Sequence, residues 1–557
     1  MRPLLVLVLA ACACSFSGPG QPADARVDAP PDSPTAAEVR FTSVTVSEAT
    51  IRPGLYGLEV TAVLRNGYTS PITGIRASLT FLEGATDRAA HFRWRDADAR
   101  DGVTAAQPAA IEPGQEATFR FRLDVLASAA ASGPILVNGS AQFQTVGGTR
   151  SAAPADSPAR LTFDASLPPP IVVDTANDED NGNNTTSLRE ALQKATANPG
   201  FDRIVFDPAV FPPGAPRVIL LDKVRDQLPP ITDTVVIDGS GANVAIEVDA
   251  SWSTPPGRYG LRVTGGTLVV HGLTFRNFAY GYPQEDLSAD NCGSGMRRAG
   301  GAILVTGGTL ILDGNELADP DVAERNCYAA SVRIAGGSGH RILNNHWTQQ
   351  VMDSVYIAAP TIEVSDNVMD AGTTAAELAK ADDGIFVETQ DGSDLWIVGN
   401  VCVDQEYSAV VASGGGTGVI HVVNNTFVRN GRTGMAAVRR DGGEHRRVEL
   451  HNNAYRDNTP SAILAGDGDG VNLTISHESA FPFQFCTGCS NAMIDIPTVA
   501  NSGDLGLTDP TGTTRAALAP AAGSPLVDTG VDLVDRNGSA PGRFNGAGPD
   551  RGAIEIP

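Results

Sequence analysis

Two aspartates stand at matching places in the second half of the chain. Asp353 and Asp383 each precede an apolar triplet by two residues, Val355-Tyr-Ile357 in one case and Ile385-Phe-Val387 in the other. If the triplets are neighbouring strands of a sheet, about 4.8 Å apart, the two carboxylates lie close together. Close carboxylates share a proton or bind a cation, and either suits sugar chemistry, as an acid/base pair or as a Ca²⁺ site. Strand parity points both side chains inward, so they could instead cap turns by accepting backbone N–H groups.

The same triplets predict a binding surface. In each triplet the flanking residues point inward and the middle residue points outward. Six aligned triplets give an outward column of Arg262, Leu304, Arg333, Tyr356, Phe386 and Val411. Arg333 and the two aromatic rings that follow it could form a platform on which a sugar stacks beside a guanidinium. Glu388 points outward two residues after Phe386, and Asp382 adjoins the paired carboxylates.

These strands belong to an internal repeat, in which an apolar strand is followed by a Gly or Asn pair and then a large apolar residue. The asparagine column of the repeat is Asn315, Asn345, Asn367, Asn400, Asn425 and Asn453. Successive copies are separated by as few as 22 residues (Trp347 to Met369) and as many as 42 (Phe275 to Leu317). A constant rung with loops of variable length is therefore expected. Asparagines can hydrogen-bond along such a stack and tolerate the left-handed backbone of a sharp turn.

This repeat resembles the right-handed parallel β-helix of the pectate-lyase-like superfamily over about residues 171–500. The resemblance implies a ligand groove along the first sheet of the β-helix, but enzymes, adhesins and tailspikes share this architecture. The chain lacks the Gly-His-Gly turn and the Arg-Ile-Lys strand of polygalacturonases, and the Arg-x-Pro-x-x-Arg segment of pectate lyases. Catalytic roles for Asp353, Asp383 and Arg333 therefore apply only if the protein is an enzyme.

A segment before the repeat resembles the start of many bacterial β-helix proteins. Residues 186–192, Thr-Ser-Leu-Arg-Glu-Ala-Leu, resemble their SLREA-type segment, with Thr186 in place of the usual cysteine. Ser187 and Glu190 have the spacing of a capping box. A helix over about residues 186–197 is expected to cover the open end of the β-helix with its apolar face.

The segment after the repeat, residues 501–557, resembles the closing segment of such surface proteins. The acidic residues Asp528, Asp535 and Asp550, together with Asn537, could gather a Ca²⁺ there. The alternative is a turn held by hydrogen bonds alone.

The N-terminus has the features of an exported, lipid-anchored protein. The apolar run Leu4–Leu9 has signal-peptide form and is too short to span a bilayer. Leu9-Ala-Ala-Cys12 resembles the bacterial lipobox, which implies removal of residues 1–11 and a lipid on Cys12; an ordinary secretory signal is the alternative. Residues 12–38 are rich in Pro, Ser, Gly and Ala and predict a flexible tether. The residue after Cys12 is not Asp, which favours the outer membrane over retention at the inner one.

Residues 39–165 predict a separate β-rich module. Short alternating runs such as Phe41–Val46 and Leu58–Leu64 are separated by turn signals such as Glu112-Pro-Gly114. This pattern indicates an Ig-like antiparallel β-sandwich. The module has no catalytic cluster, and a spacer or adhesive role is expected.

The cysteines are consistent with an oxidising compartment. Cys486 and Cys489 could close a small disulfide loop, and no second metal-binding motif accompanies them. Cys292 and Cys327 could pair if the loops that carry them stack. Cys402 falls in the apolar column and is expected to be a buried thiol.

Composition bounds the function. The 557 residues carry a net charge of −24, which excludes a nucleic-acid binder, and 42% are hydrophobic, which excludes wholesale disorder. We therefore expect an all-β protein of the cell envelope, a sandwich followed by a β-helix, anchored to the membrane by its lipid. Its function is expected to be binding of a carbohydrate or another partner. The alternative is a lyase or hydrolase of acidic polysaccharides, and no cofactor other than Ca²⁺ is implied.

Overall fold

The computed structural model describes most of the chain from residue 38 onward. The described residues are 38–94, 110–222, 227–249, 252, 258–281, 300–321, 330–350, 353–372, 374, 382–388, 390–413, 417–437, 447–459, 461–465, 472–481, 486–487, 493–494, 504–531 and 550–553. Within these ranges β-strands predominate and α1 (Leu188–Ala197) is the single α-helix. No helix of the same ranges is long and apolar enough to cross a membrane.

The first module is a β-sandwich, as the alternating runs predict. One sheet has the order β1-β3-β8-β6 and is antiparallel throughout: β1 (Val39–Val46), β3 (Tyr56–Asn66), β8 (Glu116–Val125) and β6 (Phe92–Trp94). The other contains β2 (Thr50–Ile51), β11 (Ala159–Phe163), β9 (Ile135–Thr145), β4 (Ile72–Glu83), β5 (Thr86–Asp87), β7 (Ala110–Ile111) and β10 (Gly148–Ser151). Alternate residues of both sheets, among them Phe41, Phe81 and Phe121, share one hydrophobic core.

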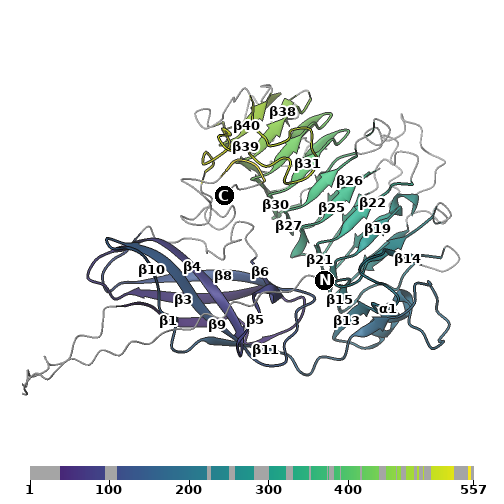
Figure 1. Ribbon diagram of the computed structural model, residues 1–557. Helices are drawn as coiled ribbons and strands as arrows, with labels where there is room; N and C mark the ends of the chain where they lie inside the picture. Colours follow the sequence, from purple (N-terminus) through teal and green to yellow (C-terminus); the bar gives the residue numbers. More distant parts are fainter. Residues whose placement is uncertain are drawn as a thin grey trace, which may run out of the picture. The chain divides into compact units, whose positions relative to one another are not determined.

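The second module is a right-handed parallel β-helix made of three parallel sheets (Figure 1). We name the sheets by the order of their strands within a rung. The first sheet contains β17 (Tyr259–Val263), β20 (Gly301–Val305), β23 (Ala330–Ile334), β26 (Asp353–Ile357), β29 (Ile385–Glu388), β32 (Ser408–Ser413), β35 (Thr433–Ala437), β38 (Ser461–Ala465) and β41 (Cys486–Thr487).

The second sheet is the longest of the three in the described residues. It contains β12 (Ile171–Val173), β13 (Phe201–Phe206), β15 (Thr234–Asp238), β18 (Thr267–His271), β21 (Thr309–Asp313), β24 (His340–Leu343), β27 (Thr361–Ser365), β30 (Asp394–Val398), β33 (Val419–Val423), β36 (Arg447–His451), β39 (Asn472–Ser476) and β42 (Met493–Ile494). The third sheet contains β14 (Arg217–Leu220), β16 (Val244–Glu247), β19 (Thr274–Arg276), β22 (Glu316–Ala318), β25 (His346–Thr348), β28 (Val368–Asp370), β31 (Val401–Val403), β34 (Thr426–Val428), β37 (Ala454–Arg456) and β40 (Ser479–Phe481).

The predicted asparagine column is a continuous ladder of hydrogen bonds inside the turn between the second and third strands. At each step the Nδ2 and the backbone N–H of one asparagine donate to Oδ1 of the next, as from Asn315 to Asn345 at 3.0 and 2.9 Å. The ladder ends at Glu478, whose carboxyl group accepts both bonds from Asn453 at 3.1 Å. Burial raises the pKa of Glu478 to about 8. The ladder is buried, so an asparagine amide without these hydrogen bonds would be a buried unsatisfied polar group, which destabilises the fold.

The left-handed backbone lies one residue earlier than the asparagine column. Asn344, Asp366 and Asn424 have φ values of 53°, 59° and 54°, and each directly precedes a ladder asparagine. The two polar residues of each turn therefore have different roles. The first makes the sharp turn and the second bonds along the stack.

A second amide ladder lies in the turn that leads into the first sheet, and the repeat motif does not predict it. The backbone N–H of Gln405 donates to Oδ1 of Asn430 at 3.1 Å, and Nδ2 of Asn430 donates to Oδ1 of Asn458 at 2.7 Å. Gln350 has a similar position two rungs earlier and donates to the Leu317 carbonyl at 3.0 Å. Loops of different length follow these residues, and they conceal the period in the sequence.

The helix α1 packs at the start of the β-helix. The predicted capping box is present: Ser187 accepts from the N–H of Glu190, and the Glu190 carboxylate accepts from the N–H of Ser187 at 3.0 Å. The apolar face of the helix, Leu188, Ala191, Leu192 and Ala195, joins the same core cluster as the first rungs. The helix thus buries the core where β12 forms the edge of the second sheet.

The described part of the C-terminal segment packs along a side of the β-helix. Its residues Leu505, Leu518 and Leu526 form a cluster with Val401 and Val428, among other apolar side chains of β31, β34 and β37. The capping of the end of the stack by residues 501–557 stays a prediction, since residues 532–549 lie outside the described residues. The outward side of the third sheet is apolar here and must be covered, and this segment covers it.

Candidate functional site

The first sheet places the predicted outward column in register. Consecutive partners across its strands are Leu304 and Arg333, Arg333 and Tyr356, Tyr356 and Phe386, and Phe386 and Val411. Strict alternation within each strand produces this column, because the residues on either side of each member, such as Val355 and Ile357, are fully buried in the core. The side chains of Arg333, Tyr356 and Phe386 are half-buried. They lie on the outside of the sheet, as the sequence predicts.

The rings of Tyr356 and Phe386 stack on each other along the axis of the β-helix. The Tyr356 and Phe386 ring centroids are 5.5 Å apart with an interplanar angle of 3°. The guanidinium carbon of Arg333 lies 4.2 Å from the Tyr356 centroid, and the Tyr356 hydroxyl donates to the Glu388 carboxylate. Both faces of Tyr356 are therefore occupied. The predicted platform is a stacked column that presents ring edges, one guanidinium and one carboxylate.

Arg262 belongs to the same column but not to the stack. Its guanidinium donates to the carbonyl of Leu228 at 3.3 Å. Leu304 stands between it and Arg333 in the register. The predicted ligand-binding residues therefore form a compact group from Arg333 to Glu388, with Arg262 two rungs away.

The predicted pair of carboxylates does meet, and Asp382 joins it. The side chains of Asp353, Asp382 and Asp383 each offer one oxygen, and these oxygens lie within 4.8 Å of one another. Asp353 and Asp383 are only 6% and 8% exposed. Asp353 Oδ1 accepts from the N–H of Asp383 at 3.3 Å, and Asp383 Oδ1 accepts from the N–H of Ser408 at 2.8 Å. These bonds match the turn-capping alternative and the inward parity of the strands.

The electrostatics of this carboxylate cluster favour the protonated form of Asp353. Burial is the largest cause that raises the pKa of Asp353 well above its usual range, followed by the charges of Asp382 and Asp383, while Arg333 opposes the shift. A carboxyl group with a raised pKa is what a general acid needs. However, a catalytic acid must reach its substrate, and this one is buried and bonded to a turn amide. The geometry therefore supports a structural role for Asp353 and Asp383.

The carboxylate group is also the single place in the described residues where three His, Cys, Asp or Glu side chains are close enough to ligate a metal. At the predicted C-terminal Ca²⁺ site, Asp550 Oδ1 accepts from the N–H of Asp528 at 2.8 Å. That contact is consistent with a turn held by hydrogen bonds, and the Ca²⁺ site stays a prediction. Asp535 lies outside the described residues.

Most of the predicted cysteine chemistry also lies outside the described residues. This applies to the lipidation site Cys12 and to Cys292, Cys327 and Cys489. Cys486 is described only by its backbone, as the first residue of β41. Cys402 is a buried free thiol, as predicted, and burial raises its pKa.

A second aromatic pair was missed. Trp396 of β30 and His421 of β33 stack on the outward side of the second sheet, with ring centroids 3.8 Å apart and an interplanar angle of 12°. Asp394 accepts from Trp396 Nε1 at 2.8 Å, and Glu449 lies 2.7 Å from His421 Nδ1. The signal was available, because Trp396 and His421 are the middle residues of apolar triplets like those of the first sheet.

Comparison with known proteins agrees with the geometry of the β-helix. Searches among curated proteins and among solved structures gave no match. One family model matches the chain, that of the right handed beta helix region, over residues 259–454. The matched range begins at the first residue of β17 and ends at the first residue of β37, so it includes the rungs that carry the stacked column.

Proposed function

We propose that this protein is a lipid-anchored protein of the cell envelope whose first-sheet surface binds carbohydrate. The observation that carries the proposal is the stacked column of Arg333, Tyr356 and Phe386 with Glu388 beside it. A sugar offers hydroxyl groups that both donate and accept, together with apolar C–H faces. The column offers guanidinium donors, carboxylate acceptors and aromatic edges within three rungs, which is a complementary set.

The N-terminal sequence supports the anchor. The apolar run Leu4–Leu9 and the lipobox-like Leu9-Ala-Ala-Cys12 are followed by a polar tether, which is the order expected of an exported lipoprotein. The capping box of α1 accords with the SLREA-type segment of bacterial β-helix proteins. Mass spectrometry of the mature N-terminus tests this part. A diacylglycerol on Cys12 is expected, and its absence would contradict the anchor without affecting the binding proposal.

Binding is favoured over catalysis. Asp353 and Asp383 are the acids that a glycosidase or lyase mechanism would need, and their oxygens accept turn amides away from solvent. Incubation with uronate and neutral polysaccharides, with and without Ca²⁺, tests the alternative through unsaturated products and reducing ends. No cleavage is expected. Cleavage by the parent protein that is lost in the Asp383→Asn variant would show that this protein is an enzyme.

The binding test uses residues 12–557 with Cys12→Ser, so that neither the apolar run Leu4–Leu9 nor a lipid is present. This protein is titrated against the same polysaccharides by calorimetry. The Tyr356→Ala variant is expected to lose at least about tenfold in affinity, or about 1.4 kcal/mol. Trp396→Ala is the matched control, because it removes a half-buried stacked aromatic from the other sheet. Loss of binding in both variants, or in neither, would count against the first-sheet site.

A further inference from the structure

The outward side of the second sheet is apolar where the sandwich meets it. Val236, Val269 and Ile311 are consecutive partners on β15, β18 and β21. They form one buried cluster with Ala127 of the sandwich, against which Tyr56 also packs. Outward residues of a β-helix are buried only if something covers them. Here the cover is the sandwich.

A glycine in the sandwich allows the close approach. Gly54 has a φ of +69°, and a Cβ at this position would lie 3.0 Å from Cγ2 of Val236. A larger residue there would be strained and would press against the second sheet. The loop that carries Gly54 is thus shaped for this contact.

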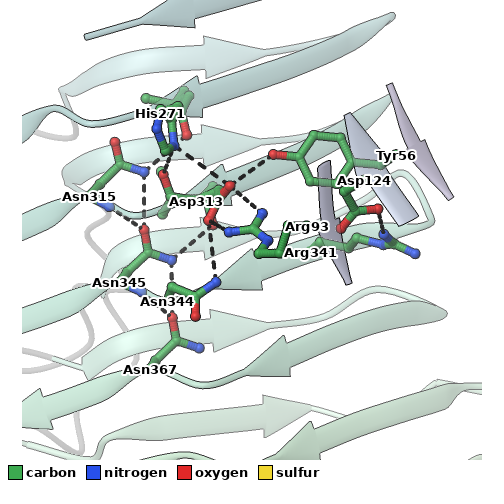
Figure 2. A network of polar contacts seen from close by, with 12 residues as sticks. Tyr56, Arg93, Asp124, His271, Asp313, Asn315, Arg341, Asn344, Asn345 and Asn367 are labelled. Carbon is green, nitrogen blue, oxygen red and sulfur yellow. Dashed lines mark hydrogen bonds and ion pairs between the residues drawn. The ribbon is translucent and has the colours of Figure 1, made fainter. Parts of the chain in front are cut away.

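Beside the apolar cluster, Asp313 of β21 is bonded by both modules, as Figure 2 shows. It accepts from the Tyr56 hydroxyl at 3.0 Å and from both Nη atoms of Arg93, two residues of the sandwich. From the β-helix, His271 Nδ1 lies 3.6 Å from its carboxylate. The Asp313 side chain is 1% exposed.

A second ion pair lies on the next rung, and here the β-helix contributes the arginine and the sandwich contributes the aspartate (Figure 2). Arg341 of β24, which follows Ile311 in the register, donates to Asp124 of the sandwich at 3.2 Å. The side chains of Arg341 and Asp124 are 8% and 1% exposed, and the guanidinium carbon lies 5.9 Å from the Tyr56 ring centroid. Each module thus contributes one arginine and one aspartate. A shift of either module would break both pairs and leave charges buried.

The charges are well matched to their surroundings. Burial by itself would raise the pKa of Asp313, but the nearby His271, the hydrogen bonds from Arg93 and the charges of both residues outweigh it and hold that pKa well below its usual range. Burial opposes the charge of Arg93 as well, and the bonds to Asp313 outweigh it and raise the pKa of the guanidinium. Both partners are therefore ionised across the physiological pH range.

We infer that the two crossed ion pairs, together with the apolar cluster, fasten the sandwich to the β-helix as a single rigid body. The sandwich is then fixed to the β-helix, which refines the spacer or adhesive role that the sequence alone suggests. It also holds the first-sheet surface in one orientation relative to the point where the tether enters at residue 38. This inference does not depend on what the first sheet binds.

The test is a distance distribution between the modules in residues 12–557 with Cys12→Ser. Spin labels carried by unnatural amino acids replace two exposed residues, Val146 of the sandwich and Glu316 of β22. One narrow distribution is expected for the parent. The Asp313→Asn, Arg341→Met double variant is expected to lose that narrow peak and to gain longer distances.

Two results would overturn the inference: a broad distribution in the parent, or an unchanged narrow one in the double variant. The parent measurement keeps the test valid even if the double variant fails to fold. Arg447→Met is the matched control, since it breaks an ion pair with Glu449 on the same sheet but outside the sandwich contact. Its distribution is expected to equal that of the parent.

Discussion

Two surfaces of the β-helix place an arginine against a tyrosine ring, and they do so with different consequences. On the first sheet, Arg333 and Tyr356 occupy adjacent strands and remain half-buried, with 4.2 Å between guanidinium and ring. On the second sheet, Arg341 is buried against Tyr56, which comes from another module, at 5.9 Å. The residue types are the same. What covers the surface decides whether the pair is available to a ligand or becomes part of an interface.

The aspartates of the two regions show the same contrast. Asp353 and Asp313 are both buried, but the pKa of Asp353 is raised by burial and by Asp382 and Asp383, whereas that of Asp313 is lowered by His271 and Arg93. Burial raises a carboxyl pKa in both places. The sign of the net shift depends on the neighbours, which are carboxylates in one case and cations in the other.

The largest expected effect separates the two arginines. Arg341→Met removes the buried ion pair with Asp124 and is expected to lower the free energy of unfolding by about 3–5 kcal/mol. Arg333→Met removes a half-exposed cation from a ring and is expected to cost at most about 1 kcal/mol. Denaturant unfolding of both variants measures the difference. Equal losses of unfolding free energy in the two variants would contradict the distinction between a covered and an uncovered surface.

A smaller effect separates the two aspartates. The raised pKa of Asp353 means that its protonated form stabilises the fold below the ordinary pKa of 3.8 and that this stability is lost as pH rises through the raised value. Asparagine imitates the protonated form, so Asp353→Asn is expected to gain on the order of 1 kcal/mol at pH 7 and nothing near pH 3.

Asp313→Asn is the matched control for that variant. The lowered pKa of Asp313 gives stability that is present above 3.8 and is lost only as pH falls through the depressed value. This variant is therefore expected to be less stable than the parent at pH 7. Unfolding midpoints measured from pH 3 to pH 8 would reveal the opposite signs, and a loss in Asp353→Asn at pH 7 would contradict the argument.

The smallest expected effect concerns His271. Its contact with the Asp313 side chain is the largest cause that raises its pKa; burial opposes the shift, and the charges of Asp313 and Asp238 reinforce it. Its stabilisation is present below the ordinary pKa of 6.5 and is lost as pH rises through the raised value. His271→Asn is expected to cost about 0.5 kcal/mol more at pH 5.5 than at pH 9. A difference that grows toward pH 9 would show that the imidazolium does not help to hold the interface.

Much of the β-helix could be predicted from local sequence. The column of Arg333, Tyr356 and Phe386 follows from alternation within each strand, and the Asn315-to-Asn453 ladder follows from one recurring residue in each rung. The capping box at Ser187 and Glu190 follows from a spacing of three residues. In every case the partners lie within one turn or one rung of each other, so a short motif contains the information.

The second amide ladder, formed by Gln405, Asn430 and Asn458, shows where this approach stops. Its members bond as the first ladder does, but they mix two residue types and are followed by loops of different length. The stacking of Tyr356 on Phe386 is a similar case. Alternation predicts that both rings point outward, but not that each covers the face of the other.

The sequence by itself therefore determined the rungs, the inward and outward sides of their strands, and the residues that could form the candidate site. Only the tertiary structure decided which outward surface is covered. Tyr56 and Asp313 are 257 residues apart, and Arg341 and Asp124 are 217 apart. Such pairs arise when two separately folded surfaces pack together. That packing depends on the combined shape and charge of both surfaces. It therefore cannot be predicted from any periodic pattern in the sequence.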